Sequence, residues 1–145
     1  LVEGLARGLA AAPSPSMVLL ACGQSAMPAF AELSRAGHVW PSGLLVLPLN
    51  CAGRVGLELI LRALGLGASG VLVAGCHEGM CRSVTGNLRA RLGVGQAAER
   101  LQALGLGPQA VSFLHMANNQ PQALQNAVEA MHRRLGQDGP AGQGD

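Results

Sequence analysis

Residues 69–81 read SGVLVAGCHEGMC, and this stretch decides the fold. Its first seven residues form a short apolar run bounded by small residues, which is typical of a strand buried on both faces of a sheet. The run leads directly into Cys76, and Cys81 follows with four residues between the two thiols. A buried strand that ends on a thiol places that thiol at an edge of the sheet.

The same alternation of apolar strand and helix continues on both sides of this stretch. The sequence predicts strands over residues 17–21, 43–49, 69–75 and 110–116. It predicts helices over residues 27–37, 55–67, 85–107 and 119–136. Apolar strands that alternate with helices indicate a parallel sheet covered on both faces. We therefore predict an α/β fold, a three-layer open parallel sheet of about four strands, flavodoxin-like in arrangement. Pro48, near the end of the second strand, indicates that this strand lies at an edge or that its pairing stops there.

Length and charge narrow the classes of protein to consider. The chain has 145 residues, of which 49% are hydrophobic, so it is large enough for one domain with a core. The net charge is +2 and only 2% of residues are aromatic, which argues against nucleic acid as a partner. No apolar run reaches the roughly 18 residues that a membrane span needs.

The two ends of the chain differ in composition from the middle. Residues 1–16 contain a Pro/Ser break and lack the charged-then-apolar order of a signal peptide, so we interpret them as a linker or fusion boundary. Residues 17–136 form the predicted domain, and the Gly-rich residues 137–145 are predicted to be a disordered tail. Four cysteines without a secretory signal favour a cytoplasmic protein that uses its thiols for metal binding or redox chemistry.

Three of the four cysteines follow predicted strands. Cys22, Cys51 and Cys76 each come just after one of the first three strands, and Cys81 lies on the loop after Cys76. The carboxyl ends of neighbouring parallel strands share one edge, where open α/β sheets bind ligands. Thiolates suit iron–sulfur clusters, zinc or Cu(I). Four cysteines with a C-x₄-C pair are compatible with a 2Fe–2S cluster, whereas the C-x₂-C pair of a zinc ribbon is absent from the sequence.

Other residues beside the cysteines are candidates for contact with a cofactor. Glycines let backbone N–H groups approach sulfur, arginines offset negative charge, and a histidine next to the thiols would tune a cluster rather than ligate it. The predicted cofactor-binding residues are Gly53, Arg54, Gly75, His77, Gly79 and Arg82.

Two blocks of sequence carry a resemblance to a known family. Residues 50–55, NCAGRV, and residues 68–91, ASGVLVAGCHEGMCRSVTGNLRAR, resemble the delta subunit of methyl-viologen-reducing hydrogenase, a family associated with heterodisulfide reductase. The resemblance covers roughly residues 17–136. It implies a flavodoxin-like fold with a 2Fe–2S cluster, which passes electrons between a hydrogenase or formate dehydrogenase and a flavin-containing heterodisulfide reductase subunit. The implied partners are other subunits or domains of such a redox complex.

The resemblance also implies a set of ligands. Cys51, Cys76 and Cys81 stand where the family has cluster cysteines, and Cys22 matches the first cysteine of its leading C-x-x-C pair. Ser25 occupies the place of the second cysteine, which is a departure from the family. The predicted metal ligands are Cys22, Cys51, Cys76 and Cys81.

Two alternatives remain open from the sequence. A thiol or persulfide redox enzyme could use Cys76 or Cys81, activated by the neighbouring His77 and Arg82. A docking scaffold that has no cofactor, or that holds a structural zinc, is the second alternative. We predict an electron-transfer domain that carries a 2Fe–2S cluster on the four cysteines, with these two functions as the alternatives.

Overall fold

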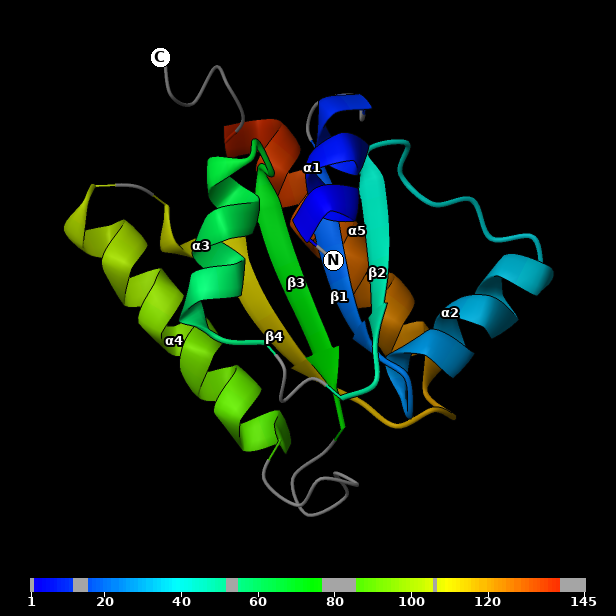
Figure 1. Ribbon diagram of the computed structural model, residues 1–145. Helices are drawn as coiled ribbons and strands as arrows, with labels where there is room; N and C mark the ends of the chain where they lie inside the picture. Colours follow the sequence, from blue (N-terminus) through cyan, green and yellow to red (C-terminus); the bar gives the residue numbers. More distant parts are fainter. Residues whose placement is uncertain (1, 12–15, 52–54, 77–85, 106, 139–145) are drawn as a thin grey trace.

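The computed structural model describes residues 2–11, 16–51, 55–76, 86–105 and 107–138 (Figure 1). Its centre is a four-stranded sheet of β1 (Met17–Cys22), β2 (Leu44–Leu49), β3 (Gly70–Gly75) and β4 (Val111–His115). All neighbouring strands are parallel, and their order is β2-β1-β3-β4. The parallel sheet predicted from the sequence is therefore confirmed.

Helices cover both faces of this sheet. They are α1 (Val2–Ala11), α2 (Ala26–Arg35), α3 (Leu57–Gly65), α4 (Gly86–Ala103) and α5 (Pro121–Asp138), and a short 3-10 helix, η2 (Pro108–Ala110), precedes β4. Buried side chains of α1, α3 and α4 pack on one face, and those of α2 and α5 pack on the other. The arrangement is the predicted three-layer, flavodoxin-like one (Figure 1).

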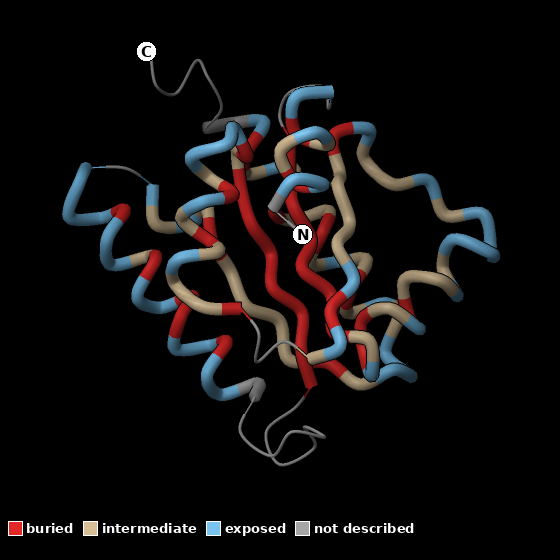
Figure 2. Tube along the Cα trace, viewed as in Figure 1, coloured by how far each residue is buried: buried red, intermediate tan, exposed pale blue. Residues whose placement is uncertain are grey.

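The core lies on the two central strands. Every residue of β1 and β3 is buried, whereas β2 and β4 are mostly half-buried (Figure 2). Along β1, Val18 and Leu20 face α1, α3 and α4, while Met17 and Leu19 face α2 and α5. This alternation follows from the period of two in an extended chain. β2 lies at an edge, which is one of the two explanations for Pro48, and its pairing with β1 continues through Pro48 and Leu49 rather than stopping there.

Helix α1 lies within residues 1–16, where the sequence analysis predicted no helix. Leu5 is 0% exposed and Leu9 is also buried, and both join the core on the side of α3 and α4. Gly8 lies so close to β2 that a Cβ atom there would be 2.7 Å from Cδ2 of Leu45. Leu5 and Leu9 are four positions apart, so they lie on the same face of the helix. This apolar face is buried because it packs against β2.

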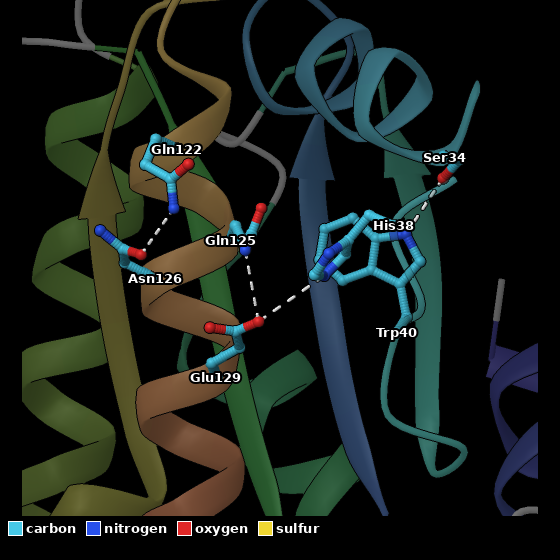
Figure 3. Close-up of polar contacts among 7 residues, drawn as sticks. All are labelled: Ser34, His38, Trp40, Gln122, Gln125, Asn126 and Glu129. Atoms are coloured by element: carbon cyan, nitrogen blue, oxygen red, sulfur yellow. Dashed lines mark hydrogen bonds and ion pairs between the residues drawn. The ribbon is translucent and has the colours of Figure 1, made fainter. Parts of the chain in front are cut away.

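The segment between α2 and β2 is attached to helices α2 and α5 by a cluster of side chains (Figure 3). Trp40 stacks on Phe30 with ring centroids 4.8 Å apart, and its Nε1 donates a hydrogen bond to Ser34 Oγ at 3.0 Å. His38 Nε2 lies 3.8 Å from Glu129 Oε2 on α5. These contacts hold the two helices of this face together at the surface. None of the helices in the described ranges combines the length and apolar character needed to cross a membrane.

Candidate metal centre

Two of the predicted ligands meet at the carboxyl edge of the sheet. Cys22 is the last residue of β1, and Cys76 directly follows β3. Their sulfur atoms lie 3.9 Å apart, and the two residues are 2% and 7% exposed. β1 lies between β2 and β3, so the strand order reverses at this point. Open parallel sheets bind ligands outside the carboxyl ends of their strands at such a reversal.

The spacing of the sulfur atoms is compatible with one shared metal ion. Two thiolates on a tetrahedral ion, each at about 2.3 Å as in zinc sites, lie about 3.8 Å from each other. The observed 3.9 Å is close to this value. A disulfide would require about 2.05 Å, so the two sulfurs are not bonded to each other. The pair therefore suits a tetrahedral iron or zinc ion that takes two thiolates from neighbouring strands.

The turn after β1 wraps around Cys22. The backbone N–H of Gln24 donates to Cys22 Sγ at 3.4 Å, and the N–H of Ser25 donates to the Cys22 carbonyl at 3.3 Å. Gly23 N–H donates to the carbonyl of Leu49 at 2.7 Å, and a Cβ on Gly23 would come within 3.1 Å of that oxygen. This close approach favours glycine and joins the end of β1 to the end of β2.

Cys51 lies at the same edge, two residues after β2 ends, and is half-buried. It does not complete a cluster with the other two thiols: within the described part of the chain, no three His, Cys, Asp or Glu side chains are close enough together to hold a metal ion. The structure thus brings Cys22 and Cys76 together and places Cys51 on the same rim of the sheet. Cys81 lies outside the described residues.

Of the other predicted site residues, the structure describes Gly75. It is the last residue of β3, and its carbonyl accepts a hydrogen bond from Met116 N–H at 2.8 Å. The rest lie outside the described residues and stay predictions: Gly53, Arg54, His77, Gly79 and Arg82.

His115 is a residue of this edge that the sequence analysis missed. It ends β4, opposite Gly75, and its Nδ1 lies 3.1 Å from the carbonyl oxygen of Cys76. Because a carbonyl only accepts hydrogen bonds, Nδ1 carries the proton. The other ring nitrogen, Nε2, is buried and has no hydrogen-bond partner among the described residues. The sequence signal that could have identified His115 is its position at the end of the fourth apolar strand. Cysteines stand at or just after the ends of the first three strands.

A family model with the description "Methyl-viologen-reducing hydrogenase, delta subunit" matches residues 17–139. This chain belongs to that family. The match includes all four strands and all four cysteines, so the edge at which Cys22 and Cys76 meet is part of the family's domain. The resemblance inferred from the blocks around Cys51 and Cys76 is confirmed.

Named relatives of this delta-subunit family member include small hydrogenase subunits. The chain is 37% identical over 111 residues to the vhu iron–sulfur subunit of the F420-non-reducing hydrogenase of Methanopyrus kandleri, covering 76% of this chain and 84% of the relative. The protein of the same name from Methanocaldococcus jannaschii is 30% identical over 127 residues, which is 87% of this chain and 94% of that protein.

A third relative shows the domain inside a larger protein. This chain is 30% identical over 115 residues to a subunit of the "Ferredoxin/F(420)H(2)-dependent CoB-CoM heterodisulfide reductase" of Methanosarcina acetivorans. The match covers 79% of this chain and 14% of that larger protein. Relatives of the delta-subunit family thus include both short hydrogenase subunits and one part of a much longer reductase polypeptide.

Proposed function

We propose that this chain is an electron-transfer domain that carries a 2Fe–2S cluster on Cys22, Cys51, Cys76 and Cys81. The observation that carries the proposal is the buried pair of sulfurs, Cys22 and Cys76, 3.9 Å apart at the point where the strand order reverses. The two hydrogenase relatives are named iron–sulfur subunits, which supports an iron–sulfur cofactor. Four thiolates are what a 2Fe–2S cluster requires.

Residues of this chain would hold and surround the cluster. Cys22 and Cys76 would be ligands from adjacent strands, and Cys51 and Cys81 would complete the set. The Gln24 N–H that points at Cys22 Sγ stabilises negative charge on that sulfur. Gly53, Gly75, Gly79 and His77 would border the cluster, and Arg54 and Arg82 would offset its charge. The bound cluster supplies one-electron exchange at this edge of the sheet.

The proposed partners are a donor of the hydrogenase or dehydrogenase type and a flavoprotein similar to heterodisulfide reductase. Relatives that are hydrogenase subunits, and one that is part of a heterodisulfide reductase, support this pairing. A cluster held by thiolates persists in a reducing compartment, so the proposal places the chain in the cytoplasm.

The same sulfur pair also suits two other candidate functions. Two buried thiols 3.9 Å apart can bind zinc in a structural site, or act as a redox-active dithiol with Cys76 or Cys81 as the attacking thiol. The three functions differ in what the chain binds and in how it responds to alkylation of its thiols.

Metal and sulfide analysis after anaerobic purification tests the proposal. We expect about two iron ions and about two acid-labile sulfides per chain, with visible absorption that dithionite bleaches. Zinc in place of iron would support the scaffold instead. A colourless protein whose activity is blocked by alkylation would support the thiol enzyme.

A further inference from the structure

The side chain of Ser25 is buried without a hydrogen-bond partner in the described structure. The residue is 2% exposed, and its Oγ is shielded from solvent. Among the described residues, no group accepts a hydrogen bond from this hydroxyl or donates one to it. A buried hydroxyl without a partner is destabilising, so the Ser25 hydroxyl calls for an acceptor that the described chain does not provide.

Ser25 does not serve as the cap of helix α2, although it occupies the N-cap position. A capping serine accepts a hydrogen bond from the N–H of the second or third helical residue. The third residue of α2 is Pro28, which has no N–H, and Ser25 makes no side-chain cap hydrogen bond. The hydroxyl oxygen therefore does not accept from the helix, and because the hydroxyl also has no acceptor among the described residues, its proton is available to another group.

The turn from Cys22 to Ser25 brings these two residues close together at the end of β1. The Ser25 N–H donates to the Cys22 carbonyl at 3.3 Å, and the Cα atoms at the two ends of such a turn lie within about 7 Å. Within the turn, Gln24 N–H already donates to Cys22 Sγ at 3.4 Å. The N-terminus of α2, the positive end of its dipole, starts at the same point. The Gln24 N–H, the Ser25 hydroxyl and the start of α2 thus follow Cys22 within four residues of the chain, and all three favour negative charge nearby.

We propose that the Ser25 hydroxyl donates a hydrogen bond to a sulfur atom of the cofactor bound by Cys22 and Cys76, and thereby raises its reduction potential. The inference rests on the proposed function. Reduction adds one negative charge to the cofactor, and a hydrogen bond to its sulfur becomes stronger as that charge increases. Ser25 therefore favours the reduced state.

The test is a reductive titration of the full chain with its cofactor, followed by visible absorption. Ser25→Ala should bind the same amount of iron as the wild type and should be harder to reduce by about tenfold in the reduction equilibrium, which is 59 mV for one electron. Ser25→Thr keeps the hydroxyl and should restore the wild-type potential. Ser34→Ala is the matched control: Ser34 lies on the same helix, and its hydroxyl donates to the Phe30 carbonyl, so the potential should not move.

The outcomes separate this inference from the proposed function. A wild-type chain without iron would overturn both. An iron-loaded Ser25→Ala variant with the wild-type potential would overturn the inference alone. Loss of iron from a folded Ser25→Ala variant would also overturn it, because the hydroxyl would then hold the cofactor rather than tune it. If Ser25→Ala does not fold, Ser25→Gly removes the same hydroxyl with a residue that suits an N-cap position, and the same results apply.

Discussion

The sulfur atoms of Cys22 and Cys76 lie 3.9 Å apart, although 54 positions separate the two residues in the chain. The contact arises because β1 and β3 are adjacent and parallel, with Ala21 aligned with Ala74, so that both strands end at the same level. Both residues are buried at that edge. This relationship is the basis for the predictions on cofactor binding.

Replacing either member of the pair should remove most of the iron. Cys22→Ser and Cys76→Ser substitute a hard oxygen for a soft thiolate, and the remaining ligands would hold a cluster poorly. Iron and sulfide analysis of the anaerobically purified variants measures the effect. Ala21→Ser is the control, because it also introduces a hydroxyl at a buried position of β1 but on the opposite face of the sheet, and it should keep its iron. Full iron in both cysteine variants would rule out these residues as ligands.

Cys81 and His77 should respond differently from each other. Cys81→Ser should lose most of the cluster because it removes a proposed ligand, whereas His77→Ala should keep the cluster with a shifted reduction potential. Iron content and a reductive titration on the same samples distinguish the two effects. A His77→Ala variant without iron would make His77 a ligand and would change the proposed set.

His115 should keep Cys76 in position through its hydrogen bond to the Cys76 carbonyl. His115→Leu removes the donor, so we expect iron to be lost to a chelator several times faster than from the wild type. His115→Asn has an amide N–H that can replace the donor, and it should restore most of the retention. Equal rates of iron loss for the leucine and asparagine variants would show that this hydrogen bond does not support the site.

Two glycines of α4 should behave in opposite ways when replaced by alanine. A Cβ on Gly95 meets no atom within 4 Å, so Gly95→Ala should stabilise the protein by about 1 kcal/mol through helix propensity. A Cβ on Gly93 would lie 3.3 Å from backbone atoms of Gly56 and Leu57. Gly93→Ala should therefore be less stable than Gly95→Ala, and less stable than the wild type if the backbone before α3 does not move. Urea denaturation of each variant gives the free energies, and equal gains for both would contradict this packing.

The local pattern of apolar and polar residues was sufficient to predict most of the strands and helices of the fold. Apolar strands that alternate with helical segments predicted the parallel sheet, because this signal depends on residues close together in the chain. Pro48 indicated either an edge strand or an end of pairing, and only the sheet itself distinguishes the two. Helix α1 was missed by the sequence analysis. Its two buried leucines, Leu5 and Leu9, form an apolar helical face, but this face is buried only because it packs against β2, which is distant in the sequence. The separate roles of Gly93 and Gly95 also depend on a neighbouring segment, which sequence periodicity does not report.

The sequence by itself determined the alternation of elements, the family, and the position of Cys22, Cys51 and Cys76 after consecutive strands. Tertiary structure decided which thiols meet: the order β2-β1-β3-β4 and the strand register bring Cys22 to Cys76. It also brought His115 to the Cys76 carbonyl and buried Ser25 beside Cys22. The physical reason is that strand propensity acts over a few residues, whereas these contacts depend on how distant segments pack around one sheet.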